Sequence, residues 1–510
     1  MPIKILFEEL KEHIKKFPSV LLLIFVYIFI IPQVLSYDQS WVEPEQFYIK
    51  MGVVKTGEGL NFQDLKNGLS WQLFEIQPRS TRPLSSYFEI LDTKFRVWLW
   101  HFMMPHPSLS LTWLFSLILT PIFLYCLLRN SSIGTDVAIT MVAFYLATPG
   151  VLSCEAMLFR PAKPMTNFFI IFCLYLASRL KKKYIDQQKD IPWGGFIIFW
   201  SFTAFSFYWD ETALLIFPSI FFFFPQVIRR KSFLWCWLSL PVVTYLGYFK
   251  IIPYLSVWAG QGLPQLTNYN KFAMMGHAHS FYQSMMFLGS NAKNLILETM
   301  GIIVPDVFKA PVLMAGCFYA AMISWGITLY YIFKVKQKWD LRLLFLVSII
   351  LFFNYLISIT MFIWGPYYYG SFWSVFFVIY LAGLMENARI PRKVMIVCFF
   401  FILLNMANAF LVTNKIYKKY HYYPYNPWVI TRYYWYDRSR FDPHVKPLLN
   451  GSQVKSLIYE YWSNVRQGKP IEQLPFPREL CWLPVELEPD KAHYWHNLLT
   501  PDDVFYLKGK

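Results

Sequence analysis

The sequence is poor in charge for its length. Only 15% of its 510 residues are Asp, Glu, Lys or Arg, whereas 56% are hydrophobic and 20% are aromatic. An average soluble domain is about 25% charged. Together with a mean hydropathy of +0.35, this shortage excludes a disordered chain and argues against a soluble globular protein.

The sequence also lacks the motifs of common soluble enzymes. It has no phosphate-binding GxxxxGK loop, no HExxH and no CxxC pair. The cysteines define no disulfide framework, because only Cys154 and Cys481 lie outside apolar blocks. His277 and His279 could bind a metal ion, but no further ligand is obvious near them. We therefore expect no cofactor and assign no metal ligands, although the sequence does not exclude a divalent ion.

Apolar residues occur in blocks of roughly 17–25 residues, the length that crosses a hydrocarbon core of about 30 Å. The sequence predicts an all-α polytopic membrane protein with about 11 transmembrane helices. The fourth, fifth and sixth blocks are short and could be tilted or re-entrant. The predicted spans are 18–36, 107–128, 133–150, 165–179, 193–209, 212–227, 233–256, 310–333, 342–362, 370–385 and 394–413.

Basic residues orient these spans. The net charge of +16 would suggest nucleic acid in a soluble protein, but here the basic residues cluster at the N-terminus and at every second connection. We therefore expect no nucleic-acid partner, a cytoplasmic N-terminus and a tail on the outer face. Among the short outer connections, only that at 151–164 carries basic residues, Arg160 and Lys163. The clustered residues are Lys4, Lys11, Lys15, Lys16, Arg129, Arg179, Lys181, Lys182, Lys183, Lys189, Arg229, Arg230, Lys231, Lys334, Lys336, Lys338, Arg342, Arg389, Arg392 and Lys393.

Two modules follow from this topology. Residues 1–413 form the transmembrane module, which includes long outer loops at 37–106 and 257–309. The first loop shows helical spacing at Glu43–Val53 and Leu84–Trp100, which predicts helices along the membrane surface. The polar, proline-rich tail 414–510 predicts a small extracytoplasmic domain of short helices and loops.

Three carboxylates fall just beyond the first span, at Asp38, Glu43 and Glu45. A carboxylate beside a low-dielectric boundary tends toward a raised pKa, which suits a general base. Pro44 fits the first turn of a helix, so the same acids could instead cap that helix and keep it soluble. Both interpretations remain open.

Outer-loop arginines are the second candidate group. Arg160 stands in an outer connection against the positive-inside pattern, so a bound phosphate or nearby Glu155 would have to hold it there. Arg79 and Arg82 lie beside hydroxyl residues in the first loop and could line a phosphate or sugar site. A local Glu155–Arg160 contact, or a basic loop before a helix, would explain them without a ligand.

Asp210 and Glu211 occupy the short outer turn between the fifth and sixth predicted spans. Two adjacent acids in so short a connection could face a binding cavity. They could equally serve to keep the tip of a helical hairpin hydrated.

The combined pattern resembles the GT-C superfamily of membrane glycosyltransferases, which includes the protein O-mannosyltransferases and the lipid A aminoarabinose transferases. The resemblance covers roughly residues 1–410. It rests on Asp38 and the acidic run Glu43–Tyr48, on the outer segment Ser153–Pro161, and on the Arg82–Ser85 run. The chain departs from the family pattern in the residues between Glu155 and Arg160, and its first loop has no Asp-x-Asp or Asp-Glu pair.

The resemblance implies an enzyme that transfers a sugar from a polyprenyl-phosphate donor to a lipid, glycan or protein acceptor. Transfer would occur on the outer side of a membrane, with inversion at the anomeric carbon. Asp38, followed by Glu45, is the first candidate for the base; Arg160, followed by Arg82, is the first for the departing phosphate. A bacterial inner membrane is the expected location.

Two other functions stay open. A transporter or flippase of a lipid-linked or anionic substrate would need ionisable residues within the spans. The predicted spans are nearly free of them, and Lys250 near a span end is the main exception. A noncatalytic assembly subunit that binds a partner through the outer tail is the other alternative.

Overall fold

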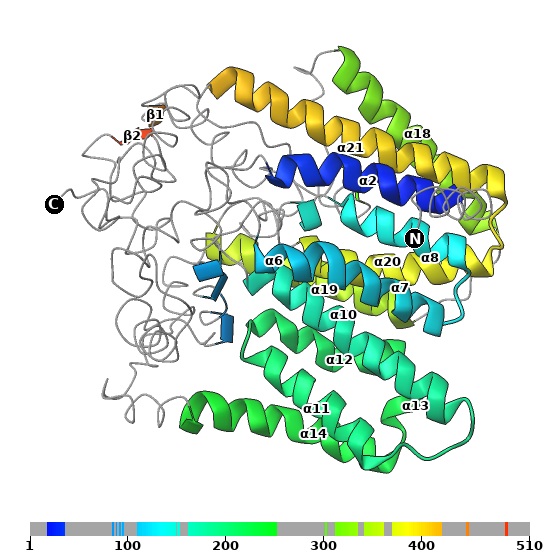
Figure 1. The fold of residues 1–510 in the computed structure, drawn as a ribbon, viewed down its shortest axis with the longest axis vertical. Helices are drawn as coiled ribbons and strands as arrows, with labels where there is room; N and C mark the ends of the chain where they lie inside the picture. Colours follow the sequence, from blue (N-terminus) through cyan, green and yellow to red (C-terminus); the bar gives the residue numbers. More distant parts are fainter. Residues whose placement is uncertain are drawn as a thin grey trace, which may run out of the picture.

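The computed structural model is a bundle of helices with one pair of short strands from the C-terminal region (Figure 1). The residues that it describes are 18–35, 84–85, 88, 91–92, 94–95, 110–148, 150–152, 162–251, 301–302, 312–334, 341–361, 370–420, 445–447 and 485–487.

The N-terminal half of the bundle contains helices of very different length. Long α-helices alternate with short 3-10 and π-helical pieces that continue or join them. They are α2 (Pro18–Leu35), α6 (Leu111–Trp113), η2 (Leu114–Leu119), α7 (Thr120–Asn130), α8 (Thr135–Leu146), α10 (Ala162–Leu180), η3 (Lys181–Ile185), α11 (Trp193–Phe207), η4 (Glu211–Leu215), α12 (Ile216–Phe223), α13 (Pro225–Ile228), α14 (Lys231–Leu246) and η5 (Gly247–Ile251).

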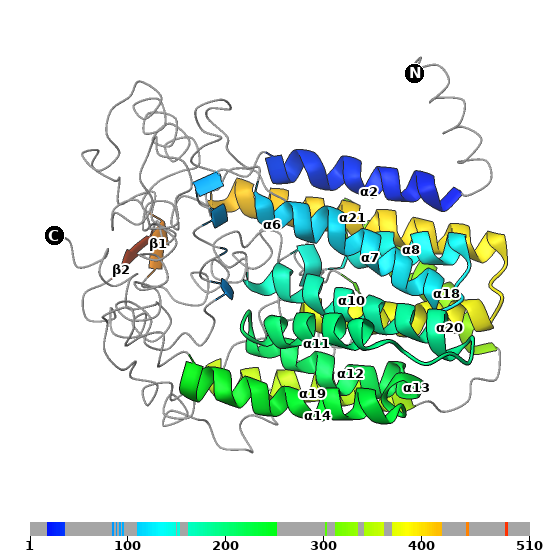
Figure 2. The same cartoon turned by 60° about the horizontal axis from the view of Figure 1, so that its bottom comes forward.

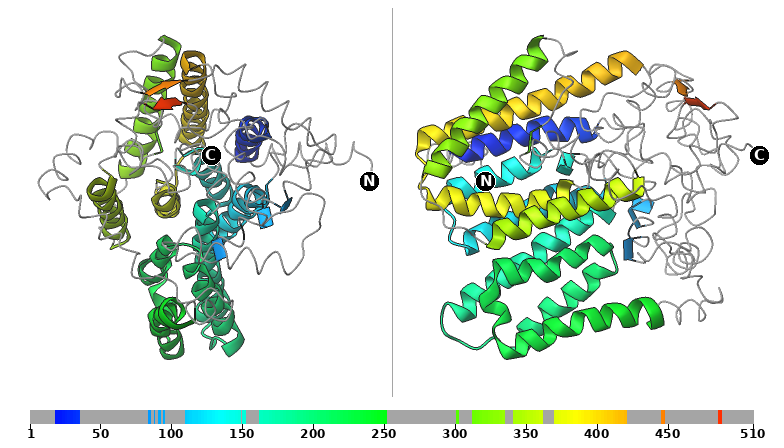
Figure 3. Two further views of the ribbon diagram at one scale, coloured as in Figure 1. Left: turned by 90° about the vertical axis from the view of Figure 1, so that its left-hand side faces the viewer. Right: turned by 180° about the vertical axis from the view of Figure 1, so that it is seen from behind.

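The described residues of the C-terminal half form four further long helices. They are α18 (Val312–Lys334), α19 (Leu341–Met361), α20 (Gly370–Asn387) and α21 (Arg392–Tyr420). Helix α18 packs along α21 at one side of the bundle (Figure 3). In the tail, β1 (Val445–Pro447) pairs antiparallel with β2 (Val485–Leu487).

Each of the eleven predicted spans coincides with one helix or with consecutive helices, so the mainly helical class is confirmed. The number of spans is not. Among the described residues, two helices are long and apolar enough to cross a membrane, Leu111–Asn130 and Ala315–Lys334; the other apolar helices are shorter by this measure. Helices of this kind also occur in the cores of soluble proteins. The count of about 11 spans therefore stays a prediction.

The two ends of the bundle differ chemically. The turns that follow α7, η3, α13 and α20 lie together at one end (Figure 2). We call it the basic end, because the turns that meet there are connections in which the sequence clusters basic residues. Acids bind helix starts at this end: Ser19 Oγ donates to Asp136 Oδ1 at 2.6 Å, and the Gly134 backbone N–H donates to Glu386 Oε2 at 2.7 Å. The opposite end, where α2 ends and α6 and α10 begin, is the loop end.

A proline explains one contact between α2 and the helical unit formed by α6, η2 and α7. Pro121 in α7 has no N–H, so the carbonyl one turn earlier, that of Leu117, receives no helical hydrogen bond from it. The Tyr27 hydroxyl of α2 donates to this carbonyl at 2.5 Å. Leu117 lies in the π-helical segment η2, the kind of irregularity that leaves backbone groups open to such partners. The contact ties α2 to the middle of the neighbouring helix.

An aromatic stack forms the core between α8, α18 and α21. Trp325 lies parallel to Phe144, with ring centroids 5.4 Å apart, and to Phe401, at 4.7 Å. All three side chains are buried. Rings packed in this way stabilise a core beyond the area that they bury.

Two residues of the predicted second outer loop enter this core. Ile302 is fully buried, and the Gly301 carbonyl accepts a hydrogen bond from Asn405 Nδ2 of α21 at 2.6 Å. Gly301 has φ +76°, and a Cβ built on it would lie 2.7 Å from Phe144 Cζ. Only glycine suits both the left-handed backbone and the close approach of the ring.

The tail differs in part from the expectation. Helix α21 does not end near residue 413 but continues to Tyr420. The described tail residues beyond it form the β1–β2 pair, where short helices and loops were expected.

Replacing Gly301 with alanine should lower the free energy of unfolding by about 1–3 kcal/mol, because the left-handed backbone becomes strained and the new methyl group overlaps Phe144. Thermal unfolding of the detergent-solubilised protein would measure this. Gly326→Ala in α18 is the matched control: an added Cβ there meets no atom within 4 Å, so the change should be neutral or slightly stabilising. An equal melting temperature for both variants would contradict the expectation.

Candidate functional site

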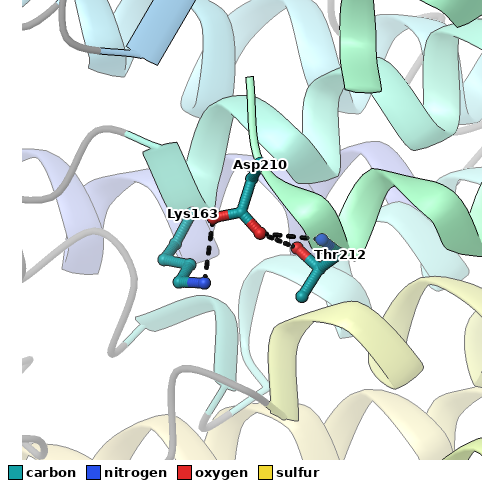
Figure 4. Close-up of polar contacts among 3 residues, drawn as sticks. All are labelled: Lys163, Asp210 and Thr212. Carbon is teal, nitrogen blue, oxygen red and sulfur yellow. Dashed lines mark hydrogen bonds and ion pairs between the residues drawn. The ribbon is translucent and has the colours of Figure 1, made fainter. Parts of the chain in front are cut away.

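A buried ion pair lies at the loop end of the bundle. Lys163 Nζ, from the first turn of α10, is 3.0 Å from Asp210 Oδ2, and the two side chains are 2% and 0% exposed. Asp210 Oδ1 accepts hydrogen bonds from the backbone N–H of Thr212, at 2.9 Å, and from the Thr212 hydroxyl (Figure 4). The pair joins two helical units that are distant in sequence.

Local sequence explains why Asp210 stands here. Helix α11 ends at Phe207, and after a short turn Asp210 adopts an extended backbone as the N-cap of η4. An aspartate at this position satisfies an otherwise unpaired N–H of the helix start, here that of Thr212. The residues of the turn therefore fix the direction of the Asp210 carboxylate before Lys163 meets it.

Aromatic rings surround the pair. Lys163 Nζ lies 5.4 Å from the centroid of the Phe372 ring. Trp209, next to Asp210 in sequence, packs against Phe169 and Phe88, with centroids 5.2 Å away in each case. Such surroundings exclude water and strengthen the attraction between the two charges. The site is an electrostatic feature in a largely apolar bundle.

The first loop reaches this site through described residues. The described residues of this stretch are helical: Leu84, Ser85, Phe88, Leu91, Asp92, Lys94 and Phe95. We call them the first-loop segment. The Leu84 backbone N–H donates to the Tyr208 carbonyl at 3.3 Å, and Phe88 also packs edge-on against Phe115 of η2, at 5.7 Å.

A second buried acid, Asp92, lies in the first-loop segment. Its carboxylate accepts hydrogen bonds from the hydroxyls of Ser110 and Thr112, at 2.6 and 2.8 Å, and from the backbone N–H of Leu111, at 2.6 Å. Asp92 is fully buried. The three donors stand at the start of the helical unit α6–η2–α7, so Asp92 attaches the first loop to that helix.

Most predicted site residues lie outside the described part of the chain. They are Asp38, Glu43, Glu45, Arg79, Arg82, Glu155 and Arg160, and the same holds for His277 and His279. Glu211 is the first residue of η4, and only its backbone is described. Asp210 is therefore the one predicted site residue whose side-chain contacts are described.

Three residues at the site were not predicted from sequence. Lys163 gave a signal, because it breaks the alternation of basic connections together with Arg160. Thr212 also gave one, since an aspartate that caps a helix accepts a hydrogen bond from the N–H two or three positions after it. Asp92 gave none, because its partners Ser110 and Thr112 lie 18 and 20 positions away in sequence.

The described residues contain no group of three or more His, Cys, Asp or Glu side chains arranged to hold a metal ion. The described part of the site offers the chemistry of a buried ammonium group held by a carboxylate among aromatic rings.

Replacing Lys163 with methionine should destabilise the fold by about 3–5 kcal/mol, because the Asp210 carboxylate stays buried without the ammonium group. The double variant Lys163→Met/Asp210→Asn should recover much of this loss, since neither charge then remains. Lys181→Met, which breaks a partly exposed pair with Asp186 at the basic end, should cost less than about 1 kcal/mol. Thermal and denaturant unfolding would rank the variants, and a double variant no more stable than Lys163→Met would contradict the assignment.

No protein-family model, curated protein or solved structure was found to match this chain.

Proposed function

We propose that this protein is a GT-C-like membrane glycosyltransferase whose module 1–413 contains about 11 transmembrane helices. It transfers a sugar from a polyprenyl-phosphate donor to a lipid, glycan or protein acceptor on the outer side of the membrane. A bacterial inner membrane, with the N-terminus in the cytoplasm, is the proposed location. The observation that carries the proposal is the buried Lys163–Asp210 pair at the loop end.

The reaction explains why a cation belongs there. The bond between the sugar's anomeric carbon and the phosphate oxygen breaks, and the electron pair leaves with the lipid phosphate. The acceptor's oxygen or nitrogen attacks the opposite face of the same carbon, so the configuration inverts, and a base takes its proton. Positive charge that is already in place stabilises the departing phosphate, most effectively where water is excluded. Lys163 supplies such a charge, and Arg160 precedes it by three residues in the sequence.

Asp210 acts in this scheme by orienting Lys163. Both of its carboxylate oxygens accept hydrogen bonds from the protein, one from Lys163 and one from Thr212. That arrangement suits a residue that fixes the direction of the ammonium group better than one that collects a substrate proton. The role of base therefore stays with the first-loop acids, with Asp38 first and Glu45 second.

The position of the buried charges favours a transferase over a transporter or flippase. Among the described residues, the buried charged side chains are Asp92, Lys94, Lys163 and Asp210. All four belong to the first-loop segment or to the helix starts and turns at the loop end. A transporter places its ionisable groups near the middle of the membrane instead. A noncatalytic assembly subunit would not need such a pair. The assay described below tests this alternative.

Turnover of a labelled polyprenyl-phosphate sugar by the purified protein in liposomes tests the proposal. We expect transfer by the wild type and a loss of at least 100-fold in Lys163→Met/Asp210→Asn, because the departing phosphate loses its cation while the fold is retained. Asp38→Asn should abolish transfer if Asp38 is the base. Lys181→Met, at the basic end, should stay within twofold of the wild type.

The assay also separates the alternatives. Movement of the intact donor across the liposome membrane without transfer would identify a flippase. Neither transfer nor movement with any donor or acceptor tested would leave the assembly subunit. Full activity in the double variant would remove Lys163 from the proposed mechanism.

The proposed topology predicts a difference in cysteine labelling. In whole cells, a cysteine in place of Asp186, in the turn after η3 at the basic end, should react with a membrane-impermeant maleimide only after permeabilisation. A cysteine in place of Lys446 in β1 should react in intact cells. Both are measured in a Cys154→Ser/Cys481→Ser background. The opposite pattern would reverse the proposed orientation.

A further inference from the structure

We propose that Asp92 is a positioning residue that fastens the first-loop segment across the loop end of the bundle. In doing so it holds the 208–210 turn, and with it the Lys163 ammonium group, in the geometry that transfer requires. The inference rests on the function proposed above, but its anchoring step is tested without any activity.

The first step is the attachment itself. A buried carboxylate is costly unless it is fully hydrogen-bonded. Asp92 offsets this cost with three donors from the start of one helix, two hydroxyls on Oδ2 and a backbone N–H on Oδ1. Hydrogen bonds to an ionised acceptor are stronger and more directional than neutral ones. The carboxylate therefore fixes both the position and the orientation of the segment that carries it.

The second step runs through the helical unit to which the first-loop segment is attached. Asp92 binds the start of α6, and Phe115 lies in η2, which directly continues α6. Ser85 and Asp92 are buried, and Phe88 packs against both Phe115 and Trp209. Asp92 and Phe88 of the first-loop segment therefore both pack on the α6–η2 unit, and the Asp92 anchor keeps Phe88 against Phe115.

The third step passes from the segment to the ion pair. Phe88 lies on Trp209, the neighbour of Asp210, and the Leu84 N–H donates to the Tyr208 carbonyl. The segment therefore holds the 208–210 turn by one ring contact and one backbone hydrogen bond. Asp210 in that turn directs Lys163. Asp92 is thus linked to Lys163 through the α6–η2 unit, the Phe115–Phe88–Trp209 contacts and Asp210.

Disulfide trapping tests the anchoring. The backbone hydrogen bond between residues 84 and 208 brings their Cα atoms close enough for a disulfide. In isolated membranes, Leu84→Cys/Tyr208→Cys should form this bond under mild oxidation, whereas the two single variants form none. Adding Asp92→Asn should lower the yield at least fivefold, because the amide nitrogen cannot accept the hydrogen bonds that a carboxylate oxygen accepts. Adding Asp136→Asn, a matched acid at the basic end, should leave the yield unchanged.

A milder variant covers the possibility that Asp92→Asn fails to fold. Thr112→Val removes one of the three donors and keeps the side-chain shape, and it should lower the disulfide yield at least twofold. An unchanged yield in both Asp92→Asn and Thr112→Val would overturn the anchoring role.

Activity tests the positioning role. Asp92→Asn should lower kcat for sugar transfer at least tenfold with little change in KM for the donor. Closing the 84–208 disulfide in that variant should restore kcat toward the Leu84→Cys/Tyr208→Cys parent, and reductant should remove the gain. A normal kcat in Asp92→Asn, or no recovery after the disulfide closes, would overturn positioning. An inactive wild type would instead refute the proposed function and leave the anchoring result standing.

Discussion

An ion pair buried among aromatic rings is the constraint on which the loop end depends. Removing an ammonium group and a carboxylate from water costs several kcal/mol for each ion, and only a close, well-directed contact repays it. Lys163 and Asp210 meet this requirement at 3.0 Å, with Thr212 holding the second carboxylate oxygen. The ion pair therefore holds the start of α10 against the turn before η4, which fixes the two helical units relative to each other.

Acids at helix starts are a recurring device in this bundle. Asp210 accepts the N–H of Thr212 at η4, Asp92 that of Leu111 at α6, and Glu386 that of Gly134 before α8. The first N–H groups of a helix have no internal partner, and the helix dipole favours negative charge beside them. The device serves two purposes here. Asp210 caps its own short helix, whereas Asp92 and Glu386 attach helix starts that lie 19 and 252 positions away in the sequence.

Aromatic packing spreads the effect of these few polar contacts. Trp209 contacts Phe169 and Phe88, so the ion pair, the first-loop segment and α10 share one cluster. In the other half of the bundle, Trp325 lies between Phe144 and Phe401, and Gly301 enters beside Phe144. Large rings transmit position because a close-packed core has little free space into which a displaced ring can move. The geometry of the proposed site thus depends on the closely packed aromatic rings around it.

The sequence by itself determined where the helices lie, because blocks of apolar residues favour helices irrespective of their neighbours, and it indicated that basic turns share one end. It also identified Asp210 as a candidate and contained the signal for Lys163. Only the tertiary structure paired these two residues and brought Asp92 to Ser110 and Thr112. Hydrophobic periodicity is a local property, whereas a buried charge is placed by partners tens of residues away in the chain, whose approach depends on how the helices pack.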